Sequence, residues 1–231
     1  MSKGFFIVID GSDGSGKATQ TALLGDRLTK EGFPVFKIDF PRYYDNLFGN
    51  LLGECLAGEH GDFANLDPYI ASVLYAADRF ETAPSIREHL SQGYVVIADR
   101  YASSNQMHQG GKIEDEAARK KFLYWLDTME FDVFKIPRPD CIVYLDMPIP
   151  MTLKLLEDNK EEMARKKQYL RRRADVVESN KIYLENSRRA AVKIVEERNT
   201  WVRIDCAEGE ELLTKEAIHE KIYNSIFPRL F

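Results

Sequence analysis

The fold of this chain is decided by the stretch Phe5-Phe6-Ile7-Val8-Ile9-Asp10-Gly11-Ser12-Asp13-Gly14-Ser15-Gly16-Lys17-Ala18-Thr19. Its first six residues are an apolar run that ends on an aspartate, which is typical of a buried strand. Gln20 to Leu28 then has the composition of a helix. A glycine-rich loop between a strand and a helix can bind phosphate, because backbone N–H groups and the helix N-terminus point to one place. The stretch therefore predicts a phosphate-binding loop in an α/β fold.

The loop follows the pattern G-x-x-x-x-G-K-[ST] except at its last position. Lys17 is placed to reach the outer phosphates of a polyphosphate as a point charge. Ala18 stands where the pattern has a hydroxyl that touches magnesium, and Thr19 comes one residue too late. On a helix that starts here we expect Thr19 to face the protein. A glycine-rich turn without a ligand is the alternative, but the lysine and the strand–helix context favour phosphate binding.

Composition limits the class of protein. The chain has 231 residues, 44% of them hydrophobic and 30% charged, which is ordinary for a globular protein. A formal net charge of −5 gives no reason to expect a nucleic acid or a membrane as partner. The chain shows no signal peptide and no apolar run of membrane-spanning length, and Cys55, Cys141 and Cys206 are widely spaced in apolar surroundings. These features predict a cytoplasmic protein with reduced core thiols.

Strand-like and helix-like stretches alternate along the chain. The runs expected to be buried strands are Phe5–Asp10, Val35–Phe40, Tyr94–Asp99, Cys141–Asp146 and Trp201–Asp205. The stretches expected to be helices are Thr19–Lys30, Pro68–Gln92, Asp115–Met129 and Val176–Arg198. This order predicts a five-stranded parallel sheet with helices on both faces, as in P-loop NTPases, and ligands at the carboxyl ends of the strands. No repeat or linker divides the chain, so we expect one domain over 1–231.

One segment after the fourth strand is strongly basic. Lys160 to Asp175 has seven basic residues against three acidic ones. A solvated helix face is the ordinary interpretation of such a run. In a phosphate-binding protein that is acidic as a whole, a lid over about 157–175 that closes on a phosphate chain is favoured.

Two other motifs carry chemistry. Asp99-Arg100 ends the third predicted strand, where the aspartate is suited to hold hydrated magnesium and the arginine to neutralise a phosphate. The alternative is that Asp99 caps the next helix and pairs with Arg100. Tyr75 and Arg79 lie four residues apart on a predicted helix, so that an aromatic face and a guanidinium are side by side, although a helical aromatic also suits a core.

Taken together, these motifs resemble the thymidylate kinase family of nucleoside monophosphate kinases. The blocks that carry the resemblance are Asp10–Lys17, Phe40–Tyr43, Leu56–Asp62, Tyr75–Arg79, Asp99–Asn105, Pro139-Asp140 and the spacing of Asp175 to Glu178. The resemblance runs nearly end to end. It implies transfer of a phosphoryl group from ATP to dTMP with Mg²⁺, and a homodimer.

The resemblance also assigns roles to residues. It implies catalytic roles for Asp13, Lys17 and Arg100, and for a lid arginine among Arg165, Arg171, Arg172 and Arg173. It implies that ATP is bound by Gly11, Ser12, Asp13, Gly14, Ser15, Gly16, Lys17, Ala18 and Thr19. It implies that dTMP is bound by Asp13, Phe40, Arg42, Tyr43, Tyr75, Arg79, Arg100, Ser104, Asn105 and His108. Because Ala18 lacks a hydroxyl, Asp13 and Asp99 are the candidate magnesium ligands.

His108 departs from the family pattern, because some relatives have a tyrosine near the sugar at this position. Three alternatives stay open at this stage. The chain could be a kinase for another nucleoside monophosphate or a deoxynucleoside, a slow nucleotide-dependent switch, or an inactive homologue, for which Ala18 is the argument.

Overall fold

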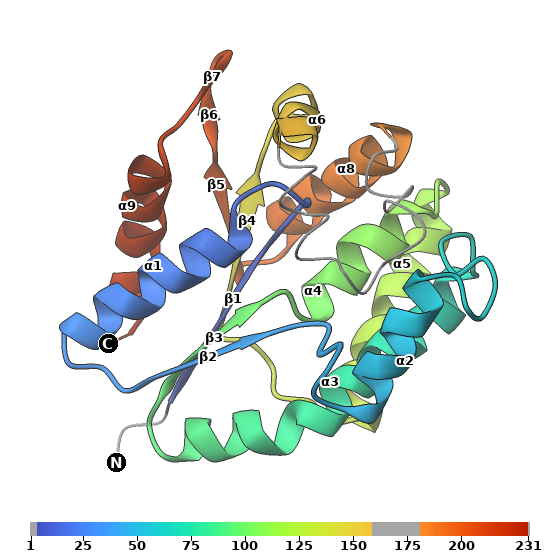
Figure 1. The fold of residues 1–231 in the computed structure, drawn as a ribbon, viewed down its shortest axis with the longest axis horizontal. Coiled ribbons are helices and arrows are strands. Elements are labelled where there is room, and N and C mark those ends of the chain that lie inside the picture. Colours follow the sequence, from blue (N-terminus) through green and yellow to red (C-terminus); the bar gives the residue numbers. More distant parts are fainter. Residues whose placement is uncertain (1–3, 159–180, 231) are drawn as a thin grey trace.

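The computed structural model describes residues 4–158 and 181–230. Its main sheet contains β1 (Phe5–Gly11), β2 (Val35–Asp39), β3 (Val95–Asp99), β4 (Cys141–Asp146) and β5 (Trp201–Asp205). All pairings in this sheet are parallel, in the order β2-β3-β1-β4-β5 (Figure 1). The five predicted strands are confirmed, with ends that differ by at most one residue.

Strand β1 lies at the centre of the sheet and is buried on both faces. Phe6 and Val8 belong to one hydrophobic cluster, whereas Ile7 and Ile9 belong to another. This alternation follows from the two-residue period of a strand. A parallel strand covered on both sides needs apolar residues throughout, which explains the unbroken apolar run in the sequence.

Helices form a layer on each face of the sheet (Figure 1). α1 (Lys17–Lys30) and α9 (Lys215–Ile226) share a hydrophobic cluster on one face. α3 (Pro68–Ser91), α5 (Glu116–Asp127) and α8 (Lys181–Glu197) contribute to the cluster on the other face. The predicted helices are confirmed where the structure describes them, except that α1 begins at Lys17, two residues earlier than predicted, and α5 ends at Asp127, two residues before the predicted Met129.

Several elements were not predicted from the sequence. They are α2 (Leu47–Leu56), α4 (Ala102–Ser104), the π-helical turns η1 (Asn105–Gln109) and η2 (Thr128–Val133), α6 (Ile149–Asp158), the hairpin of β6 (Ala207–Glu208) and β7 (Glu211–Leu212), α9 (Lys215–Ile226) and η3 (Phe227–Arg229). Short helices and π turns lack the long periodicity from which a helix is predicted. Three of them, α4, η1 and η2, carry residues of the site.

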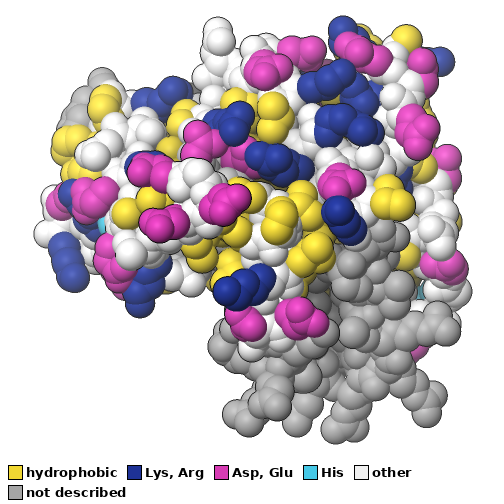
Figure 2. Space-filling view, turned by 90° about the horizontal axis from the view of Figure 1, so that it is seen from above, with side chains coloured by type: hydrophobic (Ala, Val, Ile, Leu, Met, Phe, Trp, Pro, Cys, Tyr) yellow, Lys and Arg dark blue, Asp and Glu magenta, His cyan; other side chains and the backbone are white. Residues whose placement is uncertain are grey.

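The described surface mixes charges of both signs. Figure 2 shows acidic and basic side chains interspersed across one face. None of the helices in the described ranges combines the length and hydropathy of a membrane span. All three cysteines are buried and unpaired, as predicted.

Candidate active site

The sheet topology brings the phosphate loop and Asp99-Arg100 to one edge. Strands β1 and β3 are parallel neighbours, with Ile9 opposite Asp99. The Arg100 backbone N–H donates to the Ile9 carbonyl at 3.0 Å. Their carboxyl ends therefore meet, as predicted from the strand-end aspartates.

The lysine at the end of the loop folds back and contacts the loop backbone. Gly14 and Gly16 adopt φ values of 78° and 86°, a region that glycine enters without a steric penalty. The Lys17 Nζ atom donates to the Ser12 carbonyl at 2.8 Å and to Asp13 Oδ1 at 3.2 Å. Burial lowers the pKa of Lys17, while Asp99 and Asp10 act in the opposite direction. A buried ammonium held by a carboxylate and a carbonyl is suited to transfer its hydrogen bonds to phosphate oxygens.

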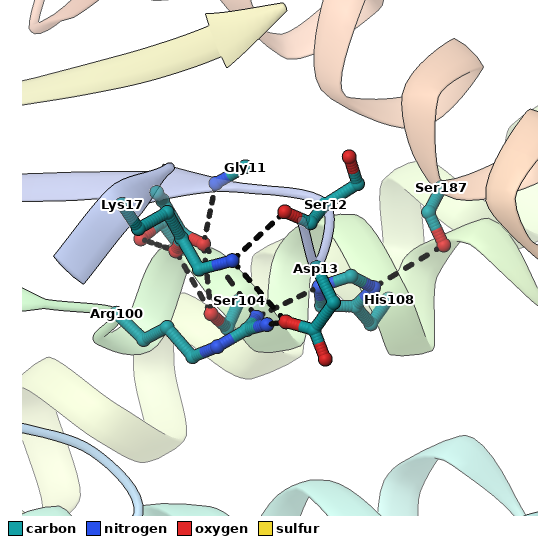
Figure 3. A network of polar contacts seen from close by, with 10 residues as sticks. Gly11, Ser12, Asp13, Lys17, Arg100, Ser104, His108 and Ser187 are labelled. Carbon is teal, nitrogen blue, oxygen red and sulfur yellow. Dashed lines mark hydrogen bonds and ion pairs between the residues drawn. The ribbon is translucent and has the colours of Figure 1, made fainter. Parts of the chain in front are cut away.

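Arg100 approaches the same carboxylate from the other side. Its guanidinium pairs with Asp13, so that Lys17 and Arg100 converge on one side chain (Figure 3). The Arg100 backbone has a φ of 67°, in the left-handed region that non-glycine residues rarely adopt. Such a conformation costs of order 1–3 kcal/mol and is retained where the surrounding structure fixes it. The strained backbone thus aims the guanidinium at the loop.

Asp10 is a buried polar centre beneath the loop. It is fully buried and accepts hydrogen bonds from the Gly11 N–H at 2.9 Å, from Ser103 Oγ at 2.5 Å and from Ser104 Oγ at 2.9 and 3.0 Å. Ser104, predicted to contact dTMP, therefore connects α4 to the end of β1 in this structure. Its contact with a substrate stays a prediction.

His108 links Arg100 to α8. The Arg100 Nη1 atom lies 3.2 Å from Nε2 of His108, and Nδ1 lies 3.3 Å from the Ser187 hydroxyl. Since a guanidinium can only donate, Nε2 accepts and the proton is on Nδ1. Burial and the neighbouring Arg100 hold the pKa of His108 well below its usual value, which agrees with a neutral ring. The ring also stacks on Tyr183 with a centroid distance of 5.7 Å.

Asp99 and Asp13 are the two candidate magnesium ligands. Burial raises the pKa of Asp99 to about 6, with Lys17 acting against the shift and Asp10 and Asp39 adding to it. Among the described residues no group of three His, Cys, Asp or Glu side chains forms a complete metal site. Mg²⁺ bound to a nucleotide usually takes one or two carboxylates and completes its shell with phosphates and water. Asp13 and Asp99 fit that requirement.

The second polar cluster of the site is formed by Arg79, Glu130 and Asn105. Arg79 Nε and Nη2 donate to the two oxygens of Glu130 at 2.8 and 2.5 Å. Asn105 Nδ2 donates to Glu130 Oε1 at 3.0 Å and to the Ser72 carbonyl at 3.2 Å. Arg79, Glu130 and Asn105 are 1–2% exposed. This bidentate ion pair fixes the guanidinium plane of Arg79.

The aromatic ring of Tyr101 lies next to this cluster. The Arg79 guanidinium carbon lies 6.0 Å from the centre of the Tyr101 ring, and Phe40 lies 5.5 Å from that ring. Tyr75 packs near Phe63 at 5.8 Å. Phe40 is only 5% exposed and belongs to the core, so its predicted contact with a base stays a prediction.

Arg42 and Tyr43 follow β2. Arg42 pairs with the exposed carboxylates Asp39 and Asp45 at 2.9 and 2.8 Å. Ion pairs of this kind are screened by solvent and exchange partners at little cost. Arg42 therefore remains available for an anionic ligand. Tyr43 packs against the small cluster formed by α2 and α3.

The structure corrects one expectation about the loop. Thr19 is exposed, whereas we expected it to face the protein. The reason is the phase of α1: its buried positions follow a spacing of three to four residues through Lys17, Gln20, Thr21 and Leu24, and Ala18 and Thr19 lie off this stripe. Thr21, two residues on, takes the buried position. The lid arginines Arg165, Arg171, Arg172 and Arg173, and most of the predicted lid, lie outside the described residues.

Sequence reasoning missed Glu130, Ser187 and the structural role of Asp10. Glu130 lies in η2, a turn with no periodic signal, and its partner Arg79 is 51 positions away in the sequence. Asp78 was also missed: it is 1% exposed and accepts from the Arg42 N–H and from Asn46. A charged residue inside an otherwise apolar helical stretch, as at Asp78, is the one signal that was available.

The fold and the loop define the class: this is an α/β protein with a P-loop between β1 and α1. The sequence profile of the family described as thymidylate kinase matches residues 9–218, and the chain belongs to that family. It is 36% identical over 140 residues to the thymidylate kinase of Mycobacterium tuberculosis; the match covers 60% of this chain and 64%, a little under two thirds, of that protein.

An archaeal relative and a solved structure are also similar to this chain. A probable thymidylate kinase of Thermococcus gammatolerans is 36% identical over 157 residues, covering 65% of this chain and 69% of that protein. The solved structure of thymidylate kinase from Candida albicans superposes with a TM-score of 0.70 at 22% identity, covering 99% of this chain and 94% of the other. That likeness confirms the predicted fold.

Proposed function

We propose that this protein transfers the γ-phosphoryl group of ATP to dTMP, giving dTDP and ADP. The observation that carries the proposal is that this chain has both a phosphate loop and a second buried polar cluster. The phosphate loop, with Lys17 and Asp13, lies at the ends of β1 and β3 together with Arg100. The second cluster consists of Arg79 on α3 and Asn105 on η1, which both donate to Glu130. A nucleotide-dependent switch would need only the first of these sites.

The residues of the loop would neutralise and align the phosphates. The loop N–H groups and the α1 N-terminus bind the β- and γ-phosphates, and the Lys17 ammonium donates to the outer phosphate oxygens. Arg100 is placed to hold the acceptor phosphate, with Asp13 positioning its guanidinium. No general base is required, because the acceptor phosphate is already an anion. Catalysis then consists of alignment and charge stabilisation.

Magnesium would be held by Asp99 and Asp13 together with phosphates and water, and it supplies additional positive charge at the transferred group. A lid arginine among Arg165, Arg171, Arg172 and Arg173 is proposed to add further positive charge at the transferred group. Single removal of the arginine that acts should lower kcat about 10²-fold or more while dTMP binding is nearly unchanged.

We also propose a cytoplasmic homodimer. Ile70, Val73 and Phe80 are 56%, 37% and 50% exposed, and they lie on the same face of α3. An apolar face of this kind is suited to a second copy of the chain. Light scattering should give twice the 26.6 kDa mass of the chain. A monomer at micromolar concentration would contradict this.

The activity is tested by a coupled ADP-release assay with ATP, magnesium and a panel of nucleoside monophosphates. We expect dTMP to give the highest kcat/KM, with dUMP second because it differs by one methyl group. Equal or faster turnover of AMP, dCMP or dGMP would contradict the proposal. No turnover with any acceptor would support an inactive homologue.

A further inference from the structure

The buried Glu130 carboxylate fixes which polar atoms the acceptor site offers to a base. Its Oε1 atom receives hydrogen bonds from both Arg79 Nη2 and Asn105 Nδ2, and Oε2 receives Arg79 Nε. The carboxylate is 1% exposed. The Glu130 carboxylate therefore holds the Arg79 and Asn105 side chains in place from a buried position.

The orientation of the Asn105 amide follows from its partners. One amide atom of Asn105 lies 3.0 Å from Glu130 Oε1 and 3.2 Å from the Ser72 carbonyl oxygen. Both partners are acceptors only, because Glu130 is a carboxylate paired with Arg79. That atom must be the donating Nδ2. The carbonyl Oδ1 consequently points the other way.

Two atoms of this cluster remain open to a ligand. Among the described residues, Arg79 Nη1 and Asn105 Oδ1 have no hydrogen-bond partner. Unlike the Tyr101 hydroxyl, neither atom is both sealed from solvent and unpartnered. The site thus presents one donor and one acceptor, on two side chains that are both hydrogen-bonded to Glu130 Oε1.

This pair of atoms matches one class of base. A pyrimidine-dione such as thymine or uracil offers a C4 carbonyl acceptor beside an N3–H donor. Arg79 Nη1 can donate to the former and Asn105 Oδ1 can accept from the latter. Cytosine offers the reverse, an amino donor beside an unprotonated N3, and would meet donor against donor and acceptor against acceptor.

We propose that Glu130 is a positioning residue that sets the preference for oxo- over amino-pyrimidine acceptors by fixing the Asn105 amide and the Arg79 guanidinium. The inference rests on the proposed function of the site and adds a residue that does not itself touch the substrate. Replacing the carboxylate by an amide would put a donor against Arg79 or Asn105, and would release the Asn105 amide to rotate.

The test compares kcat/KM for dTMP and dCMP in wild type, Glu130→Gln and Glu130→Asp. We expect E130Q to lower the dTMP/dCMP ratio at least about tenfold, because one hydrogen bond is lost and one is mismatched. E130D keeps an acceptor-only group and should lower kcat/KM for both substrates while the ratio stays within about threefold of wild type. The ratio does not depend on the fraction of folded enzyme, because both substrates meet the same sample.

A matched control is Asp127→Asn, a carboxylate-to-amide change nearby. Asp127 accepts from Gln106 at 2.8 Å and pairs with Arg198 at 3.0 Å, outside the site. D127N should leave the ratio unchanged. If E130Q does not fold, Asn105→Ala replaces it, and its ratio should fall by a similar factor.

The outcomes separate the inference from the proposed function. A wild type that does not prefer dTMP would contradict the proposed function. A wild type that prefers dTMP, with an unchanged ratio in E130Q, would overturn the role of Glu130 alone. An unchanged ratio in N105A would do the same if E130Q is not obtained.

Discussion

The phosphate end and the base end of this site are built in opposite ways. At the phosphate end, Lys17 and Arg100 converge on Asp13, which is 18% exposed, the carboxylates of Asp10 and Asp99 act on Lys17 as well, and Arg100 holds a strained backbone. At the base end, Arg79 is matched to its own carboxylate, Glu130, and both are nearly inaccessible. At the phosphate end the two cations are therefore shared among several carboxylates and can exchange one of them for an anionic ligand, whereas the base end is a one-to-one buried ion pair.

The difference teaches how each end is expected to respond to mutation. Residues at the phosphate end are held by charges that a ligand can replace, so they matter for catalysis more than for folding. Residues at the base end form a buried pair, and breaking such a pair leaves an uncompensated charge in the interior. They should matter for both.

The largest expected effect is on turnover at the phosphate end. Lys17→Met removes the ammonium that donates to the outer phosphates. This change should lower kcat about 10³-fold, the upper range for one preorganised donor. Thermal unfolding should shift little, because the ammonium is already destabilised by burial. Steady-state kinetics and calorimetry on the same sample check both parts. A fall of less than tenfold in kcat would remove Lys17 from the chemistry.

Arg79→Ala tests the base end. We expect kcat/KM for dTMP to fall by an amount equivalent to roughly 1.5–3 kcal/mol, the range for a hydrogen bond to a charged group. Unlike K17M, this variant should also lose about 3–5 kcal/mol of unfolding free energy, because Glu130 becomes a buried unpaired charge. Denaturant titration measures the second effect. Equal stability of R79A and wild type would mean that the two ends do not differ as described.

Asp99→Asn gives an effect that depends on pH. Burial raises the pKa of Asp99 to about 6, so ionising it costs the folded state up to about 3 kcal/mol relative to an unfolded chain with a value near 3.8. This cost is absent below pH 3.8 and complete above pH 6. The melting temperature of D99N should therefore exceed that of wild type most at pH 7–8, with the difference shrinking as pH falls. The same variant should need more magnesium for activity. A difference in melting temperature that is constant from pH 5 to pH 8 would contradict the shift.

The smallest expected effect comes from the loop hydroxyl. Ala18 is exposed at the start of α1, so a serine there is tolerated sterically. Ala18→Ser should lower the magnesium concentration needed for half-maximal rate or leave it unchanged, with an unfolding free energy within about 0.5 kcal/mol of wild type. An increased magnesium requirement would show that the ion is held differently.

The sequence predicted the phosphate end better than the base end, for a physical reason. Lys17, Asp13 and the glycines lie within one loop, and the parallel sheet brings Arg100 to them by topology alone. The base end depends on a side-chain contact between α3 and η2, and no local pattern encodes which carboxylate a buried arginine will find. Glu130 was therefore missed although Arg79 and Asn105 were named.

The solvent exposure of a single residue on a helix was also not predicted correctly from the sequence. The expectation for Thr19 failed because the inward face of α1 runs through Lys17, Gln20, Thr21 and Leu24, and Thr19 lies off that face. Conversely, Pro139-Asp140, noticed only as part of a family resemblance, has a structural role. Asp140 accepts from the Phe6 N–H at 2.8 Å and ties the segment before β4 to β1.

The measurement that tests the contrast most directly is the dTMP/dCMP ratio of kcat/KM in Arg100→Ala beside Arg79→Ala. If the ends act separately, R100A lowers both rates alike and keeps the wild-type ratio, because both substrates carry the same phosphate. R79A should lower the ratio at least about tenfold, because it removes the donor to the C4 carbonyl. A ratio that falls equally in both variants would contradict the account.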